Sequence, residues 1–154
     1  MTLVTASIEI DAPRERVYDL VLDPTRLDEW VTIHRRVNAR DAGPPREGFE
    51  MDQTLHLRGA NFHVRWKLTE AERPGRATWE GRGPAHSYAR TSYLLKAIDG
   101  DKTRFEYENE FKAPGGFLGA AASRMLIGGL PQREATRSLQ RLKALLENGR
   151  ARDR

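Results

Sequence analysis

The sequence predicts a single α+β domain in which a long C-terminal helix covers one face of a curved, seven-stranded antiparallel sheet. Apolar and polar residues alternate through residues 2–10 and through six stretches between 33 and 113, which is the period of half-buried strands. Helix-start signals separate the first strand from the rest, and a helical pattern fills residues 114–147. The 154 residues suit one domain, which we assign to 1–148 with a frayed tail at 149–154.

The N-terminal segment should contain one strand and two short helices. Residues 2–10 direct alternate apolar side chains to one side, namely Val4, Ala6, Ile8 and Ile10. Asp11 precedes Pro13, and Asp23 precedes Pro24. Each aspartate offers a capping oxygen, and each proline has the φ of a first helical turn. Apolar residues follow at helical spacing, with Val17, Leu20 and Val21 in the first helix and Leu27, Trp30 and Val31 in the second.

Two hairpins predict the register of the sheet. A two-residue loop at Gly59-Ala60 pairs Leu55 with Val64, Gln53 with Trp66 and Met51 with Leu68 on one face, and Asp52 with Lys67 and Thr54 with Arg65 on the other. A three-residue loop at 99–101 pairs Leu95 with Phe105, Tyr93 with Tyr107, Thr91 with Asn109 and Arg90 with Glu110. One face is apolar in both hairpins, so the antiparallel sheet should have one covered and one solvated face.

Residues 114–147 are expected to cover the apolar face. Their helical pattern runs through Phe117, Ala121, Met125, Leu139, Leu142 and Leu146. Gly128, Gly129 and Pro131 interrupt this pattern near its middle. Because a proline inside a helix removes a hydrogen bond, we expect a kinked or two-part helix lying along a concave sheet.

The order of these elements is that of the helix-grip fold, and three stretches resemble the START-related, polyketide cyclase/dehydrase-like superfamily (SRPBCC). They are Ile8-Glu9-Ile10-Asp11-Ala12-Pro13 with Arg16-Val17-Tyr18, Asp23-Pro24 through Leu27 to Trp30, and Ser138-Leu139-Gln140-Arg141-Leu142-Lys143. The resemblance spans nearly the whole chain. It implies the helix-grip fold, but that architecture serves lipid carriers, aromatic cyclases and hormone receptors alike, so it does not select an activity.

The inward face of the sheet is rich in aromatic residues, which would ordinarily indicate a packed core. Because the chain resembles the START-related superfamily, we expect a cavity instead, since a curved sheet and one helix leave a space that side chains do not fill. The residues expected to bind an apolar ligand there are Trp30, Phe49, Met51, Gln53, Leu55, Phe62, Val64, Trp66, Trp79, Thr91, Tyr93, Phe105, Tyr107, Asn109, Phe111, Phe117, Ala121 and Met125.

Gln53 and Asn109 are polar exceptions on this apolar face. A buried amide without a partner costs about 1–3 kcal/mol, so both should be hydrogen-bonded. Either they orient a carbonyl or hydroxyl of the ligand together with Tyr107 and Thr91, or they bond one another, the backbone or trapped water. The sequence leaves both interpretations open.

We expect no catalytic residue, metal or cofactor. The sequence has no cysteine and contains no nucleophile elbow, zinc-protease helix motif or phosphate-binding loop. His56 lies opposite His63 in the predicted register, but two histidines make an incomplete metal site on the outer face, so we favour a solvated pair. His34 could act as an acid or base at a cavity mouth, although we favour a surface role.

The leading hypothesis is therefore a protein that binds or carries a lipid, polyketide-like or other apolar metabolite. The first alternative is a cyclase/dehydratase-like enzyme in which Tyr107, Asn109, Gln53 or His34 polarises carbonyls and moves protons. The second is an interaction module that contacts a protein or an anionic membrane surface through a basic C-terminal helix, which carries Arg133, Arg137, Arg141 and Lys143.

The charge and hydropathy of the sequence limit the expected cellular location of the protein and its expected partners. The net charge is +4, but acidic residues are mixed among the basic ones, so we expect no nucleic acid. No stretch approaches the roughly 20 apolar residues of a membrane span, and the N-terminus does not resemble a signal peptide. Together with the absence of cysteine, these features favour a cytoplasmic protein.

Overall fold

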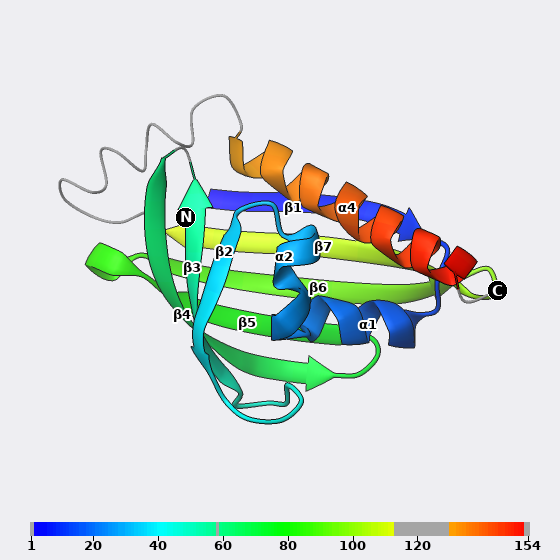
Figure 1. The fold of residues 1–154 in the computed structure, drawn as a ribbon, viewed down its shortest axis with the longest axis horizontal. Helices are drawn as coiled ribbons and strands as arrows, with labels where there is room; N and C mark the ends of the chain where they lie inside the picture. The colour runs from blue at the N-terminus through cyan, green and yellow to red at the C-terminus, as the bar shows by residue number, and fades with distance from the viewer. Residues whose placement is uncertain (1, 58, 113–129, 153–154) are drawn as a thin grey trace.

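The computed structural model describes residues 2–57, 59–112 and 130–152 (Figure 1). The chain forms β1 (Thr2–Ile10), α1 (Arg14–Leu22), η1 (Pro24–Arg26), α2 (Leu27–Trp30), β2 (His34–Arg40), β3 (Glu50–Leu57), β4 (Ala60–Glu72), β5 (Arg76–Arg82), η2 (Pro84–His86), β6 (Tyr88–Ile98), β7 (Lys102–Lys112) and α4 (Leu130–Arg152). The predicted α+β class and order of strands are confirmed.

The seven strands form one curved antiparallel sheet in the order β1-β7-β6-β5-β4-β3-β2. Figure 1 shows α4 crossing the face of the sheet near β1, with α1 and α2 beside it on the same face. Three hydrogen bonds tie α4 to the β1 segment: Gln132 donates to Thr5 O, Lys143 donates to Glu9 O, and Asp11 N donates to Glu147 Oε1. The helix is thus fixed along one edge strand.

The register of the β6–β7 hairpin is as predicted. Tyr93 pairs with Tyr107, and Thr91 pairs with Asn109. Gly100 occupies the loop with a φ of +73°, a left-handed conformation that glycine adopts without steric cost. These pairs place two tyrosines and the Thr91–Asn109 pair side by side on the covered face.

The predicted register of the β3–β4 hairpin is wrong by two residues. Leu57 pairs with Ala60, so Ala60 begins β4 and Gly59, with a φ of +80°, lies in the loop. Alanine is disfavoured at the positive φ that a tight hairpin loop demands, which explains the shift. The observed pairs are Met51 with Trp66, Gln53 with Val64, Leu55 with Phe62, Asp52 with Arg65 and Thr54 with His63.

A shift of two residues keeps every side chain on its predicted face, because strand side chains alternate with a period of two. It does separate the two histidines that the sequence placed opposite each other. His56 faces Asn61, and its Nδ1 donates a hydrogen bond to Asn61 Oδ1 over 2.7 Å. His63 instead contacts Thr54 Oγ1 over 3.1 Å. The predicted His56–His63 pair is therefore wrong.

The predicted helix starts are correct at one aspartate and wrong at the other. Asp23 caps η1 by accepting a hydrogen bond from Thr25 N over 2.9 Å. At α1, Pro13 occupies the N-cap position, which has no side-chain capping bond. Asp11 lies two residues before the N-cap position, because the chain is still extended at Pro13.

Pro131 lies in the first turn of α4 as the structure describes it, from Leu130 onward. The kinked or two-part helix that the sequence suggested stays a prediction, because residues 113–129 lie outside the described residues. The expected earlier part of the helix, with Phe117, Ala121 and Met125, lies outside the described residues. α4 also continues to Arg152, past the domain boundary predicted at 148, and the fraying of the tail stays a prediction.

The two halves of α4 cover different parts of the sheet. Leu142 and Leu146 are buried at the C-terminal half, in a core that includes Phe105, Leu95 and Val17. The N-terminal half, from Pro131 to Leu139, borders an unfilled space. The fold therefore packs densely at one end and leaves a cavity at the other.

A cavity between the sheet and the C-terminal helix

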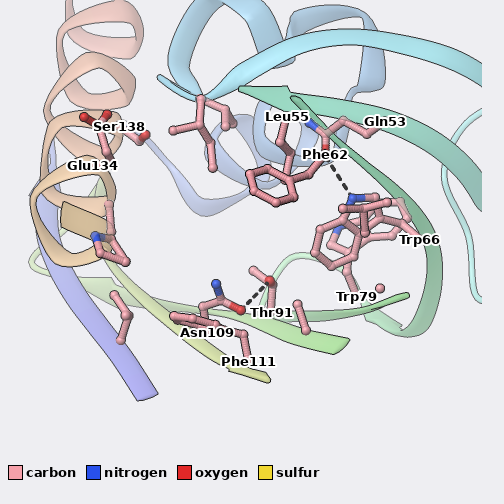
Figure 2. Close-up of a pocket in the computed structure, with 18 of the residues that line it drawn as sticks. Gln53, Leu55, Phe62, Trp66, Trp79, Thr91, Asn109, Phe111, Glu134 and Ser138 are labelled. Carbon is pink, nitrogen blue, oxygen red and sulfur yellow. Dashed lines mark hydrogen bonds between the residues drawn. The ribbon is translucent and has the colours of Figure 1, made fainter. Parts of the chain in front are cut away.

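The cavity has a volume of about 280 Å³, and apolar atoms form most of its surface. Figure 2 shows its side chains converging from the sheet, from α4 and from the segment that follows α2. Of the residues expected to bind a ligand, those that line this cavity are Trp30, Met51, Gln53, Leu55, Phe62, Val64, Trp66, Trp79, Thr91, Tyr93, Tyr107, Asn109 and Phe111.

Two expected residues belong to the packed core instead of the cavity wall. Phe49 is 1% exposed and packs edge-on against Trp79, with ring centroids 6.2 Å apart. Phe105 is 0% exposed and lies beside Tyr93, with ring centroids 5.4 Å apart. Both face inward as predicted, but each lies behind an aromatic ring that does reach the cavity.

The cavity also contains residues that the sequence analysis did not select. Leu27 and Val31 share the helical stripe of Trp30, and Ala135, Ser138 and Leu139 form one face of α4, so their spacing could have revealed them. Gly81 could not be found by hydrophobic pattern. The other unselected lining residues are Val4, Val21, Leu22, Thr32, Ile33, Leu57, Gly83, Pro84, Ser87, Tyr88, Ala89, Lys112, Pro131 and Glu134.

Gly81 makes room for the indole of Trp66. The two residues pair across β4 and β5, and a Cβ built on Gly81 would lie 2.6 Å from Trp66 Cε3 and 2.8 Å from Val64 Cγ1. Both distances are well below van der Waals contact, so only glycine allows the ring to lie flat over this strand. The absent side chain therefore shapes one wall of the cavity.

A hydrogen-bonded chain lies behind that wall. Gln53 is 5% exposed, and its Oε1 accepts from Trp66 Nε1 over 2.8 Å. The Gln53 amide nitrogen lies 2.8 Å from His34 Nδ1. Both polar ends of this buried amide thus have protein partners, as expected, but these are the side chains of Trp66 and His34, which neither interpretation named. Burial lowers the pKa of His34, while Asp28 nearby acts in the opposite direction. His34 itself does not line the cavity.

The sheet presents hydrogen-bond donors to the cavity. Thr91 Oγ1 donates to Asn109 Oδ1 over 3.2 Å, and Figure 2 shows the Asn109 amide nitrogen turned toward the interior. Tyr93 stacks with Tyr107 at a centroid distance of 6.2 Å. Burial raises the pKa of Tyr107 to about 12, against the effect of a hydrogen bond with Asn109, and burial also raises the pKa of Tyr93. Both hydroxyls are neutral near pH 7.

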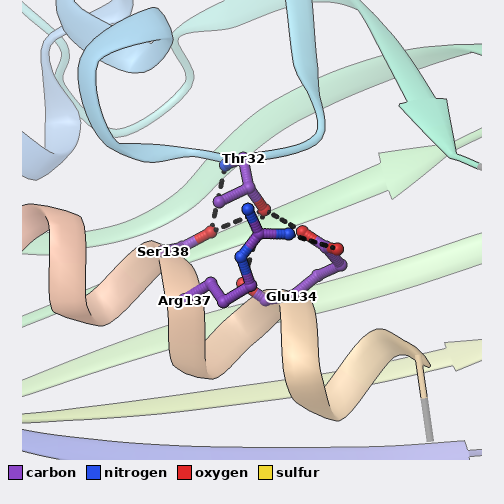
Figure 3. A network of polar contacts seen from close by, with 4 residues as sticks. All are labelled: Thr32, Glu134, Arg137 and Ser138. Carbon is purple, nitrogen blue, oxygen red and sulfur yellow. Dashed lines mark hydrogen bonds and ion pairs between the residues drawn. The ribbon is translucent and has the colours of Figure 1, made fainter.

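The helix side of the cavity carries a carboxylate, which the sequence analysis missed. Glu134 accepts from Thr32 Oγ1 over 2.5 Å and from Arg137 Nη1 over 3.3 Å. Thr32 N donates to Ser138 Oγ over 3.1 Å (Figure 3). Glu134 lies among arginines on α4, which made it resemble a residue on a solvated helix face. Its side chain is only 18% exposed because Thr32 covers it.

Trp30 forms another part of the wall, and its ring meets that of Tyr93 edge-on at a centroid distance of 6.3 Å. The side chain is 2% exposed. Within the described part of the chain, its Nε1 is buried without a hydrogen-bond partner. The cavity therefore contains few polar groups, and they are located at separate points on an aromatic surface.

A comparison with protein families identifies the family to which this fold belongs. The model of a family described as polyketide cyclase/dehydrase and lipid transport matches residues 1–147. The chain belongs to this family. A comparison with curated proteins found no match.

Solved structures related to this polyketide cyclase/dehydrase family member agree on the fold. A Thermus thermophilus protein superposes with a TM-score of 0.75 at 18% identity, covering 96% of this chain and 99% of its own. A conserved protein from Geobacillus kaustophilus gives 0.73 at 17%, covering 96% of both chains. A START superfamily protein from Mycobacterium smegmatis gives 0.66 at 15%, covering 95% and 97%. At these identities the likeness establishes the helix-grip fold alone.

Other predicted properties of this family member concern its surface and partners. Arg133 and Arg141 are exposed on α4, whereas Arg137 pairs with Glu134 and Lys143 pairs with Glu147 at 2.7 Å. A contact of this helix with a protein or membrane stays a prediction, as does the cytoplasmic location. None of the described helices has the length and hydropathy needed to cross a membrane. The described residues include no cluster of three potential metal ligands.

Proposed function

We propose that this protein binds a mostly apolar small molecule in the cavity between α4 and the sheet. The observation that carries the proposal is an unfilled space of about 280 Å³ surrounded by three tryptophans, namely Trp30, Trp66 and Trp79. A core selected for stability alone would be packed to crystal-like density. An aromatic-walled space with a few placed polar groups is the usual form of a small-molecule site.

The size of the cavity limits the ligand. Small-molecule sites typically measure about 300–1,000 Å³, so this one lies at the lower end of the range. We infer that it accommodates a compact ring system or a short acyl chain better than a lipid with two long chains. The flat faces of the three indoles favour a ring system, because stacked and edge-on aromatic contacts add to the burial of apolar area.

The polar groups on the sheet favour a ligand with a hydrogen-bond acceptor. Thr91 already occupies Asn109 Oδ1, and the Asn109 amide also hydrogen-bonds Tyr107, which leaves its remaining N–H to face the interior. Tyr93 carries a neutral hydroxyl that has no hydrogen-bond partner among the described residues. A carbonyl or ether oxygen near these groups would be fixed in orientation by donors that are already in place.

A cavity-filling substitution tests the proposal. Ala135 lines the cavity and is 9% exposed, whereas Ala144 is exposed on the same helix. The test ligand is N-phenyl-1-naphthylamine, a neutral fluorescent dye. We expect Ala135→Phe to weaken its binding by tenfold or more, because the phenyl ring fills cavity space and removes roughly one buried apolar contact from the dye. Ala144→Phe is the matched control and should leave binding unchanged. Native mass spectrometry of the purified protein should additionally reveal a bound apolar molecule.

Two results would end the proposal. One is a wild-type protein that neither binds the dye nor retains any apolar molecule. The other is equal dye affinity in Ala135→Phe and Ala144→Phe, with circular dichroism showing that both are folded, since binding would then occur outside this cavity.

A cyclase/dehydratase-like enzyme is the second candidate, and the position of Glu134 favours it. General acid–base chemistry on a polyketone needs a carboxylate or a similar group within reach of the substrate, and Glu134 lines the same cavity as the neutral tyrosines. In an enzyme, Glu134→Gln should abolish turnover while dye binding is retained. Unchanged turnover of polyketone substrates in Glu134→Gln and in Tyr107→Phe would eliminate this candidate.

A further inference from the structure

Trp66 is held in the cavity wall by a chain of two hydrogen bonds that ends at His34. The indole N–H of Trp66 donates to Gln53 Oε1, and the other end of the Gln53 amide meets His34 Nδ1, each over 2.8 Å. His34 lies on β2 opposite Leu55, on the covered side of the sheet. Trp66 is thus linked through a single buried amide to a histidine that does not itself line the cavity.

The chemistry of the three groups fixes every proton in this chain. An indole N–H can only donate, so the atom of Gln53 that faces Trp66 must be the carbonyl oxygen. The amide nitrogen then faces His34 and can only donate. His34 Nδ1 must therefore be an unprotonated acceptor, which places the single ring proton of the neutral imidazole on Nε2.

We propose that His34 is a positioning residue for the ligand cavity and that its protonation weakens ligand binding by releasing Trp66 from its fixed orientation. The inference rests on the proposed ligand-binding function. A protonated imidazole donates at both nitrogens, so Nδ1–H would confront the donating amide nitrogen of Gln53. The existing hydrogen bond cannot survive this change.

Rotation of the Gln53 amide does not rescue the arrangement. A flipped amide presents its oxygen to the protonated His34, but its nitrogen then faces the indole N–H of Trp66. One buried donor is left without an acceptor in either orientation, which is the costly outcome for a buried polar group. The strain is relieved when Gln53 or Trp66 moves, and either movement breaks the hydrogen bond that holds the Trp66 ring in place beside Gly81.

The surroundings of His34 support a neutral imidazole at neutral pH. Burial lowers its pKa, and the charged group that opposes this effect is Asp28 on α2. On the neighbouring strand β3, His34 pairs with the uncharged Leu55 and is hydrogen-bonded to the uncharged Gln53. On its own strand, Arg35 follows it in the chain and is exposed. Protonation of His34 should thus require a lower pH than protonation of an ordinary exposed histidine, because burial lowers its pKa.

The test measures the dissociation constant of N-phenyl-1-naphthylamine, which stays uncharged, between about pH 7.5 and 5.5. We expect wild-type affinity to fall about tenfold across this range, the size of effect that follows from one unsatisfied buried donor. His34→Asn should bind with the wild-type affinity measured at about pH 7.5 and show no such fall, because Oδ1 of asparagine replaces Nδ1 as an acceptor that does not titrate.

Two further variants separate positioning from structure. His34→Leu removes the acceptor and should bind about tenfold more weakly at every pH, so rescue by asparagine and not by leucine identifies the acceptor as the cause. His63→Asn is the matched control, since His63 is exposed on the other face of β4. It should retain the full pH dependence of the wild-type protein.

The possible outcomes have distinct meanings. A pH dependence that persists unchanged in His34→Asn, or affinity that is flat in the wild-type protein, would overturn the inference while the proposed function stands. Dye that binds at no pH, in a protein that also retains no apolar molecule, would instead overturn the proposed function. Nitrogen-15 NMR of the wild-type protein decides independently of any variant: a ring proton on Nε2 of His34 supports the chain, and a proton on Nδ1 of the neutral ring contradicts it.

Discussion

The backbone N–H of Thr32 donates to the hydroxyl of Ser138 over 3.1 Å, across 106 positions of sequence. This contact joins the segment after α2 to the face of α4 that borders the cavity, and Thr32 Oγ1 extends it to Glu134 (Figure 3). Among the described residues, no strand pairs with α4 on this side of the cavity, so these polar contacts hold the segment after α2 against the helix.

Removal of the Ser138 hydroxyl should therefore loosen the helix side of the cavity. Ser138 is 7% exposed, and Ser138→Ala leaves the Thr32 N–H without its acceptor. We expect the free energy of unfolding to fall by about 1–2 kcal/mol in urea titrations. Thr136→Ala serves as the control, because Thr136 is exposed and its hydroxyl donates to Gln132 O of its own helix. Equal losses in both variants would contradict a bridging role for Ser138.

A methyl group on Gly81 should disturb the opposite wall. In Gly81→Ala the new Cβ would lie 2.6 Å from the Trp66 ring, and overpacking of this kind typically destabilises a protein by about 1–3 kcal/mol. We expect a lower melting temperature and a shifted tryptophan emission spectrum. Gly75→Ala is a suitable comparison, since its Cβ would meet nothing closer than 3.6 Å. A Gly81→Ala variant as stable as Gly75→Ala would show that Trp66 has more freedom than its contacts indicate.

The sheet could be predicted from sequence because its pattern is local. The 99–101 loop has a length that fixes register by itself, so the Tyr93–Tyr107 pair is as predicted. At the other hairpin, two loops one residue apart both contain Gly59 and give the same faces. Hydrophobic alternation cannot tell them apart, and the choice follows from which residue tolerates positive φ.

The cavity was harder to predict, because it depends on where elements distant in sequence meet. Alternation correctly turned Phe105 inward, but whether a ring packs in the core or reaches the cavity depends on what lies in front of it. Glu134 is concealed in sequence by its arginine neighbours, and its burial follows from Thr32, a residue of an irregular segment. Hydrophobic alternation therefore predicts the face on which a side chain lies, but it does not predict whether that side chain packs in the core or reaches the cavity.

Tyr107 should make stability depend on alkaline pH. Burial raises its pKa to about 12 in the folded protein, above the ordinary value of about 10. A raised pKa means that the folded state holds the proton more tightly, so this contribution is complete below about pH 10 and is lost as the pH rises toward 12. Wild-type protein should lose more stability than Tyr107→Phe between these values, as measured by urea unfolding. Parallel losses would show that Tyr107 ionises freely in the folded state.

Two leucines on α4 should respond differently to truncation because only one borders the cavity. Leu142 is 0% exposed in the packed core, whereas Leu139 is 2% exposed and lines the cavity. Leu142→Ala leaves a new void surrounded on all sides and should lower the free energy of unfolding by about 3–5 kcal/mol. Leu139 has fewer partner atoms on its cavity side, so Leu139→Ala should cost less, about 2–3 kcal/mol.

The variants Leu139→Ala and Leu142→Ala should also differ in ligand binding, and in the opposite order to their loss of stability. Leu139→Ala enlarges the ligand space, so it should bind a dye bulkier than N-phenyl-1-naphthylamine more tightly than the wild-type protein does, even though the variant is less stable. Leu142→Ala should leave the dissociation constant near the wild-type value at temperatures where it is folded, since the residue does not reach the cavity wall. A reversed order, with Leu142→Ala altering dye size selectivity, would mean that the ligand lies deeper between α4 and the sheet than the lining residues indicate.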